Sequence, residues 1–363
     1  MATAPVPSPK SQMLGVKLAS GWTLIELLQK PHGLSGGNFG VGYRATMGGR
    51  NAFVKAVDFV AAMSAPDPMA RMGELTSETL FEQEVLEYCT SKGMSKVIRF
   101  IGHEYYNCAP PDPLLRVSCL IMEAGDKDLR YLVHTDGLAT CAWNMQVMRD
   151  ISQALAQLHK GNIAHGDIKP SNVIATSVAA TEMKVGDLGR VVRSDKPGPF
   201  DSMRWTGDSN YWPPEAWYGN IPGALTTGWN NTREAIDAYM LGSLLVYLFT
   251  NASMQSLVVK EIQSGFEPGV WRGNYDDNLI AVLIDAHSKV LNKYLAPELD
   301  GEMRDAVMAI ARDLTHPNPV KRGDKRARRH INDLVGIDRI YQKFESLATR
   351  CAVAARVRAK RTI

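Results

Sequence analysis

The sequence predicts an α+β protein with two lobes, a smaller strand-rich front and a larger helical back. Up to about residue 124, short apolar runs alternate with turns that contain Gly and Pro, as strands do. From about residue 139, apolar residues recur at the 3.6-residue spacing of helices. There is no internal repeat. A cleft between the two lobes is the expected place for a small-molecule site.

The front half contains a clear hairpin signal. The runs GVGYRATM and NAFVKAVDF flank the tetrapeptide Gly48-Gly49-Arg50-Asn51, which is typical of a tight turn between two strands. Residues 59–76 carry two prolines and mixed polarity and are expected to form an insertion or long loop. A helix is predicted from Ser77 to Lys92. Further strands are expected at 96–106 and 115–123.

The back half is expected to be mainly helical. Helices are predicted over 145–159, 235–250, 276–293, 301–314 and 331–357. Within the second of these, the stretch AYMLGSLLVYLF is too short to span a bilayer and is interpreted as a buried helix. The domain boundaries that follow are a disordered segment over 1–20, a front lobe over 21–124, a back lobe over 125–335 and a basic helical extension over 336–363.

Composition places the chain among ordinary globular proteins. Its 363 residues are 45% hydrophobic and 22% charged, which is enough to bury a substantial core. The five cysteines are scattered and form no CxxC pair, which favours a reducing compartment over a disulfide framework or a zinc site. The N-terminus lacks the charged and apolar regions of a signal peptide. A soluble cytoplasmic protein without a transmembrane segment is expected.

The segment HGDIKPSNV carries the strongest chemical signal. Phosphoryl transfer needs a carboxylate to orient the acceptor hydroxyl, a positive group near the moving phosphoryl and an oxygen ligand for magnesium. Asp167, Lys169 and Asn172 supply these three within six residues. Asp187, in KVGDLGR, is a plausible second magnesium ligand, although alone it would be interpreted as an ordinary turn residue.

Together with their neighbours, these segments resemble the eukaryotic-type protein kinase family. The motifs follow the family's order over residues 34–322: LSGGNFGVG, AFVKAVD, FEQEVLEY, LIMEAG, HGDIKPSN, DLG, YWPPE, DAYMLG and NPVKR. The resemblance implies a two-lobed protein-kinase-like fold with a β-rich N-lobe and a helical C-lobe. It also implies transfer from ATP, with Mg²⁺ or Mn²⁺, to a protein substrate. Lys169 favours Ser or Thr as acceptor.

The resemblance assigns the site residue by residue. Catalytic roles fall to Asp167 and Lys169, and metal ligation to Asn172 and Asp187. ATP binding falls to Gly37, Gly40, Lys55, Glu84 as the partner of Lys55, Met122 as gatekeeper, Glu123, Gly125 and Ile174. Structural roles fall to Glu215, to Asp237 on the buried helix, and to Arg322 as the partner of Glu215.

The sequence departs from the family pattern at several positions. Ser35 stands where the first loop glycine is usual, Gly42 where a valine covers adenine, and Phe53 where alanine is usual. The last two changes either compensate for each other or reshape the adenine pocket. Gly166 replaces the arginine that reads an activation-loop phosphate, so activity is expected not to depend on that phosphate. Asp208 replaces a threonine near the acceptor site.

Two other functions remain open. The HGD triplet also resembles small-molecule kinases of the aminoglycoside and choline type, but those lack counterparts of Glu215, Asp237 and Arg322. A pseudokinase scaffold would be consistent with the odd adenine-pocket residues, whereas the retained catalytic residues argue against it.

The C-terminal end is strongly basic. Residues 319–363 carry a local charge of +9 in a chain whose net charge is +3. This end is expected either to be a solvated helix face or to contact an acidic partner or an anionic surface.

Overall fold

The computed structural model describes residues 8–28, 40–108, 115–134, 140–177, 179–203, 205–219, 229–299, 301–331 and 333–361. The chain divides into two compact units. Unit 1 comprises Met1–Asp126 and Gly186–Gly189, and unit 2 comprises Lys127–Val185 and Arg190–Ile363. Strands gather in the first unit and helices in the second, so the predicted α+β class is confirmed.

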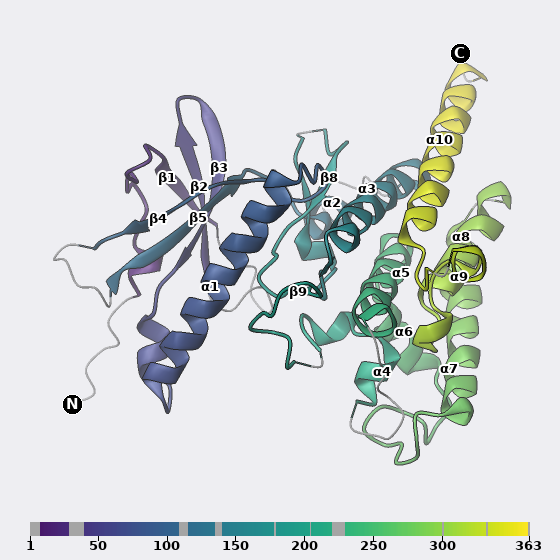
Figure 1. Ribbon diagram of the computed structural model, residues 1–363. Helices are drawn as coiled ribbons and strands as arrows, with labels where there is room; N and C mark the ends of the chain where they lie inside the picture. Colours follow the sequence, from purple (N-terminus) through teal and green to yellow (C-terminus); the bar gives the residue numbers. More distant parts are fainter. Residues whose placement is uncertain are drawn as a thin grey trace. The chain divides into compact units, whose positions relative to one another are not determined.

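Unit 1 is built on a five-stranded antiparallel sheet with the strand order β1-β2-β3-β5-β4 (Figure 1). Its elements are η1 (Pro9–Ser11), β1 (Thr23–Leu28), β2 (Val41–Met47), β3 (Arg50–Val57), η2 (Val60–Ser64), α1 (Pro68–Ser91), β4 (Phe100–Tyr106) and β5 (Val117–Glu123). The predicted β2–β3 hairpin is confirmed. Gly48 and Gly49 form its turn at φ of 55° and 76°, a left-handed conformation that glycine adopts without steric cost.

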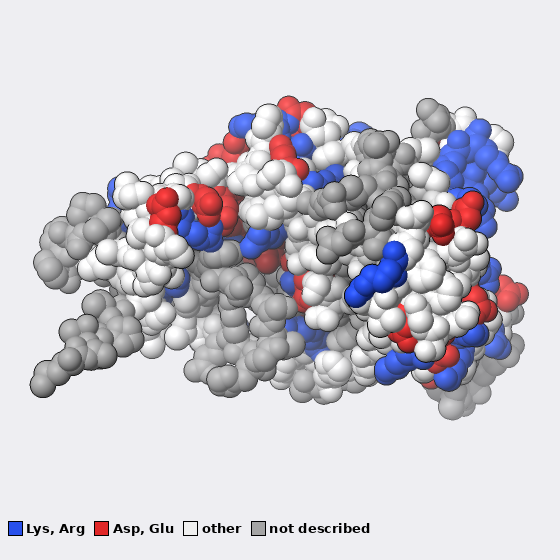
Figure 2. Space-filling view, turned by 90° about the horizontal axis from the view of Figure 1, so that it is seen from below, with Lys and Arg blue, Asp and Glu red and all other residues white. Residues whose placement is uncertain are grey.

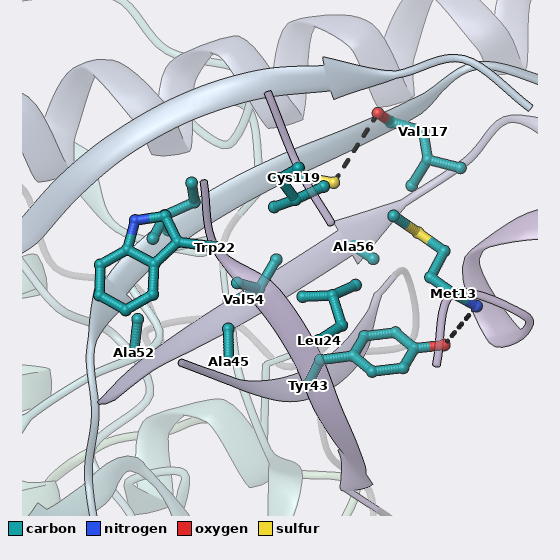
Figure 3. Packing of buried hydrophobic residues seen from close by; sticks show 12 residues of the cluster. Met13, Trp22, Leu24, Tyr43, Ala45, Ala52, Val54, Ala56, Val117 and Cys119 are labelled. Atoms are coloured by element: carbon teal, nitrogen blue, oxygen red, sulfur yellow. Dashed lines mark hydrogen bonds between the residues drawn. The ribbon is translucent and has the colours of Figure 1, made fainter. Parts of the chain in front are cut away.

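The sheet buries a compact apolar cluster, and its residues come from strands and from the N-terminal segment (Figure 3). Trp22, Leu24 and Tyr43 supply the larger side chains, while Ala45 and Ala52 allow close packing on neighbouring strands. Burying a large apolar side chain stabilises the fold by roughly 1.5–3 kcal/mol relative to its exposure.

The predicted disorder of residues 1–20 is wrong from residue 8 onward. Met13 and Leu18 are almost fully buried in the cluster of unit 1. The Tyr43 hydroxyl donates a hydrogen bond to the Lys10 carbonyl at 2.7 Å. It accepts one from the Met13 amide at 3.2 Å, which Figure 3 shows. The segment is ordered because its apolar side chains pack into the core of unit 1. The Pro- and Ala-rich composition of its start suggested disorder instead.

The helix α1 begins at Pro68 and not at Ser77, so part of the expected loop is helical. The side chain of Asp67 caps the helix by accepting a hydrogen bond from the Ala70 amide at 3.0 Å. Pro68 occupies the first helical position, where its missing N–H has no intrahelical partner to lose. The proline that suggested a loop therefore marks the start of the helix.

Unit 2 is mainly helical, with two small two-stranded sheets (Figure 1). Its first elements are α2 (Leu129–His134), α3 (Cys141–Lys160), β6 (Ile163–Ala164), η4 (Pro170–Asn172), β7 (Val173–Ala175), β8 (Met183–Val185), β9 (Val192–Arg193), η5 (Ser209–Tyr211) and α4 (Pro214–Trp217). The remaining elements are η6 (Asn230–Glu234), α5 (Ala235–Thr250), α6 (Met254–Glu261), α7 (Asp277–Val290), η7 (Leu291–Leu295), η8 (Ala296–Glu298), α8 (Gly301–Leu314), η9 (Pro319–Lys321), α9 (Lys325–His330) and α10 (Ile337–Arg361).

The centre of unit 2 is α5, whose side chains are buried from Ala235 to Leu248. The prediction of a buried apolar helix here is confirmed. Among the described residues, no single helix is both long and apolar enough to cross a membrane. Thr232–Thr250 and Met254–Glu261 meet the length and composition test only as a pair, across a bend of 81°.

Candidate functional site

Unit 1 places a lysine between two carboxylates. Lys55 lies on β3, and its Nζ is 2.7 and 2.8 Å from the two carboxylate oxygens of Glu82 on α1. The same Nζ is 3.5 Å from Oδ1 of Asp187. Burial alone would lower the pKa of Lys55, but the two carboxylates outweigh it and raise that pKa. Lys55 is therefore held as a cation in a fixed position.

The partner of Lys55 is Glu82, and the prediction of Glu84 is wrong. Residues two apart on a helix point to different sides, so Glu82 and Glu84 do not share a face. Glu82 shares its face with Val85, Leu86 and Cys89, which follow at helical spacings of three, four and seven and are all buried. This spacing was the signal in the sequence that could have identified Glu82.

The pKa of Glu82 is also shifted by its surroundings. Glu82 is only 6% exposed. Burial raises the pKa of Glu82, Lys55 lowers it, and the neighbouring Asp187 raises it further. Two carboxylates thus compete for one ammonium group in this part of unit 1, which favours binding of a further cation near Asp187.

The loop that covers the phosphates in the family falls partly outside the described residues, and Gly37 lies there. Gly40 is described, and a Cβ at this position would be 3.0 Å from Cγ of Lys55. A Cβ on Gly42 would be 2.8 Å from Cε2 of Phe53. The Phe53 ring therefore occupies space that a side chain at position 42 would need, so the two departures from the family pattern fit together.

The remaining unit 1 positions lie on or after β5. Met122 faces Phe53 across the β3–β5 ladder and is 5% exposed. Glu123 ends the strand, and its Oε1 accepts a hydrogen bond from the Arg99 amide at 2.6 Å. Gly125 follows the strand and is partly exposed.

Unit 2 gathers the catalytic-loop residues around one carboxylate. Lys169 Nζ lies 2.9 Å from Oδ2 of Asp167. Asn172 donates through Nδ2 to the Asp167 carbonyl at 2.8 Å and to its Oδ2 at 3.1 Å. All three residues are at least 95% buried. Ile174, two residues further on, lies on β7 and is partly exposed.

Asp208 adds a contact that sequence reasoning missed. Its backbone amide donates to Oδ1 of Asp167 at 2.8 Å, and its carboxylate oxygen Oδ2 lies 3.9 Å from Lys169 Nζ. The preceding residue, Gly207, has a φ of 77° and brings the backbone close to Asp167. Both oxygens of the Asp167 carboxylate are thereby fixed. No local pattern in the sequence indicates that the segment around Asp208 lies against the segment around Asp167.

Gly166 has a structural reason to be a glycine. Its φ is 69°, and a Cβ there would overlap Oγ1 of Thr206. The amides of His165 and Gly166 both donate to the carboxylate of Asp237, at 2.8 and 2.7 Å. His159 Nε2 lies 2.8 Å from the same carboxylate. Asp237 therefore ties the catalytic loop to α3 and α5.

Glu215 and Arg322 form a buried, two-pronged ion pair. Their two nitrogen–oxygen contacts measure 2.8 and 2.9 Å, and Arg322 has no exposed surface. The guanidinium also donates to the carbonyls of Ala235 and His316, at 2.9 and 3.0 Å. Such planar, bidentate geometry is specific to arginine.

Each unit supplies an oxygen atom of the kind that magnesium prefers as a ligand. Asp187 supplies a carboxylate in unit 1 that is 30% exposed. In unit 2, Asn172 directs its amide nitrogen to Asp167, while its Oδ1 accepts a hydrogen bond from the Ser171 hydroxyl at 3.3 Å and is the oxygen that would bind a cation. Within the described part of the chain, no group of three or more His, Cys, Asp or Glu side chains could hold a metal ion. Magnesium commonly uses one or two protein ligands together with phosphates and waters.

Comparisons with known proteins show the family of this chain. The family model of the protein kinase domain matches residues 34–267, and the chain therefore belongs to the protein kinase family. The chain is 30% identical over 145 residues to a probable serine/threonine-protein kinase, ireA, from Dictyostelium discoideum. It is 28% identical over 141 residues to the serine/threonine-protein kinase PTK2/STK2 of Saccharomyces cerevisiae. It is 27% identical over 132 residues to the serine/threonine-protein kinase PknB of Mycobacterium tuberculosis.

Each match covers only part of this chain and only part of the relative. The matched stretches are 40%, 36% and 36% of this chain and only 13%, 17% and 20% of the three relatives. The chain thus spans a fifth or less of the length of each of these proteins.

Proposed function

We propose that this protein transfers the γ-phosphoryl group of ATP to Ser or Thr hydroxyls of proteins. The observation that carries the proposal is the fixed carboxylate of Asp167. Its Oδ1 accepts the Asp208 amide, while its Oδ2 faces Lys169 and Asn172. A carboxylate held in this way is suited to orient an acceptor hydroxyl and take its proton.

The other side chains divide the remaining work. Lys55, fixed by Glu82, would bind the α- and β-phosphates. Lys169 would stabilise charge that develops on the transferred group. Asp187 and Asn172 would hold magnesium, which when bound neutralises phosphate charge. Gly37 and Gly40 would let the backbone approach the phosphates. Adenine contacts are assigned to the four positions that the resemblance names: Met122, Glu123, Gly125 and Ile174.

We also propose that this activity does not need a phosphate on the activation segment. At Gly166 there is no side chain to read a phosphate, and Thr206 fills the adjacent space. Arg193 lies in the activation segment, residues 190–210. Its guanidinium is occupied by the carboxylate of Asp195, at 3.0 and 2.8 Å. Phosphatase treatment should leave activity unchanged. A large loss that maps to residues 190–210 would overturn this part of the proposal.

The acceptor class is tested by one assay with three sets of acceptors. Labelled ATP is offered with generic protein substrates, small alcohols including choline, and aminoglycosides, and transfer is also scored on the protein itself. Label on Ser and Thr of proteins supports the proposal. Transfer confined to a small alcohol or an aminoglycoside would make the protein a small-molecule kinase.

A scaffold without transfer is the second candidate function, and the Phe53 ring beside Gly42 favours it. If the ring blocked the adenine pocket, ATP would not bind. Thermal unfolding with ATP and magnesium decides this point, because a ligand that binds the folded state raises Tm by mass action. We expect a rise in the wild type, and a rise of similar size with Phe53→Ala. A rise only in Phe53→Ala would favour the scaffold.

The basic C-terminal end is proposed to bind an acidic partner. Figure 2 shows a group of Lys and Arg side chains on the right, the side on which α8, α9 and α10 lie in Figure 1. On α10, Arg350 and Arg356 are exposed. Replacing both with Gln keeps the helix and removes two charges. Unchanged, salt-insensitive binding to polyglutamate or heparin would contradict the proposal.

A further inference from the structure

Two cysteines meet where the last helix packs against α3. Cys141 is the first residue of α3, and Cys351 lies on α10. Their sulfur atoms are 3.7 Å apart although the residues are separated by 210 positions in the chain. Neither forms a disulfide in this structure. Figure 1 shows α10 running alongside α3 in unit 2.

The pair lies at the C-terminal end of a row of buried side chains on α10. The buried side chains of this helix include Ile340, Phe344, Leu347 and Cys351, which follow one another at helical spacing. Beyond Cys351, residues 352–354 and 356 are exposed. Among the α10 side chains that the structure describes, Cys351 is therefore the last buried one.

We propose that Cys141 and Cys351 form a reversible disulfide that fastens α10 to α3. A disulfide needs its sulfur atoms about 2.05 Å apart, so they must approach by about 1.7 Å. Rotation of two side chains on the flanking helix turns can supply a movement of this size. The proposal is independent of any phosphoryl transfer.

The two thiols have unequal access, which assigns their roles. Cys141 is partly exposed, whereas Cys351 is 8% exposed. Cys141 also lies in the first turn of a 20-residue helix, whose positive end favours the thiolate. Cys141 is therefore the attacking group, and Cys351 is the resolving group beneath it.

The reaction requires a two-electron oxidant, for which we name a small disulfide such as oxidised glutathione. The Cys141 thiolate attacks one sulfur of that disulfide and releases one glutathione thiolate. The Cys351 sulfur then gives up its proton, attacks Cys141 and releases the second glutathione. Two cysteine thiols are oxidised to one disulfide, while one glutathione disulfide is reduced to two thiols.

The other three cysteines are less suited to this exchange. Cys89 and Cys119 are 1% and 0% exposed, and burial raises the pKa of Cys119 to about 12. Burial also raises the pKa of Cys108, which lies in unit 1. Cys108 is partly exposed and lies on neither α3 nor α10, so it serves as the control thiol.

The experiment titrates the full reduced chain with mixtures of reduced and oxidised glutathione. We expect two of the five thiols to disappear together, with no change in monomer mass on a non-reducing gel. After alkylation and digestion with trypsin, the crosslink should join peptide 131–149 to peptide 351–356. Tm of the oxidised chain should rise by several degrees, because the bond closes a long loop. Dithiothreitol should reverse both changes.

Variants distinguish the pair from general thiol oxidation. Cys141→Ser should lose the crosslink and the rise in Tm, whereas Cys108→Ser should keep both. If Cys351→Ser proves too unstable to study, the peptide map of the wild type and Cys141→Ser still decide. A crosslink that includes Cys108, a disulfide-linked dimer, or stable glutathionylation of Cys141 without a crosslink would each overturn the proposal.

Discussion

The position of the partner of Lys55 is the sharpest prediction, because the structure assigns Glu82 where the family resemblance suggested Glu84. The perturbation is Glu82→Gln, with Glu84→Gln as its matched control. Both changes remove one negative charge from α1 without changing side-chain size. Glu82 contacts Lys55 through both carboxylate oxygens, at 2.7 and 2.8 Å.

The magnitude follows from the geometry. The Lys55 and Glu82 side chains are 18% and 8% exposed, so little solvent screens their attraction. A hydrogen bond to a charged group contributes roughly 1.5–3 kcal/mol. If Lys55 binds ATP only when fixed by Glu82, losing this contact should lower kcat/KM by about 10- to 100-fold. Asp187, at 3.5 Å, would draw Lys55 away from the phosphates.

Stability should respond much less than activity. Burial and the nearby Asp187 raise the pKa of Glu82, so its ionised form is costly in the folded state. The neutral amide avoids this cost and keeps an oxygen for Lys55. We expect Glu82→Gln to change the free energy of unfolding by no more than about 1 kcal/mol.

The assay measures kcat and KM for ATP in the wild type and in both variants, with urea unfolding measured in parallel. The expected pattern is a large loss of kcat/KM in Glu82→Gln alone, at nearly constant stability. A loss that is greater in Glu84→Gln than in Glu82→Gln would refute the assignment of the ion pair.

Three further predictions concern unit 2. Arg322→Met should destabilise the protein by about 3–5 kcal/mol, measured by urea unfolding, because it leaves Glu215 charged and buried. His159→Gln should make Tm depend less on pH. Burial lowers the pKa of His159, but the hydrogen bond to Asp237 outweighs burial, so the pKa of His159 is raised. The stability that His159 contributes is thus full below pH 6.5 and lost as pH rises through the raised pKa. Gly166→Ala should cost about 1–3 kcal/mol in unfolding free energy, because φ is 69° there.

Each of these predictions has a control. Adding Glu215→Gln to Arg322→Met should restore part of the lost stability, since it removes the unpaired charge. A change of Tm with pH that is the same in wild type and His159→Gln would contradict the role of that histidine. A loss below 0.5 kcal/mol for Gly166→Ala would show that the backbone relaxes easily at this position.

The elements with a local signal could be predicted from the sequence. The β2–β3 hairpin follows from adjacent glycines, and α5 follows from an uninterrupted apolar stretch. The α1 start was missed because a proline marks a first helical turn as readily as a loop. Glu82 and Glu84 face different sides of α1. The buried side chains of Val85, Leu86 and Cys89 show that the side of Glu82 faces the interior of unit 1.

The rest of the candidate site depends on contacts between distant segments. The sequence suggested Asp167, Lys169 and Asn172 because they lie within six residues. It could not show that Asp208 would donate its amide to Asp167, since 41 positions separate the two. The ordered segment around Met13 was missed for the same reason, because its partner Tyr43 lies on β2, 30 positions away.

The most direct test of the central claim compares phosphoryl transfer by the wild type and Asp167→Asn, with binding of ATP and magnesium measured in both. We predict transfer in the wild type, a loss of at least about 1,000-fold in kcat for Asp167→Asn, and a similar rise in Tm with ATP in both proteins. Transfer at an undiminished rate in Asp167→Asn, or its absence from a wild type that binds ATP, would contradict the account.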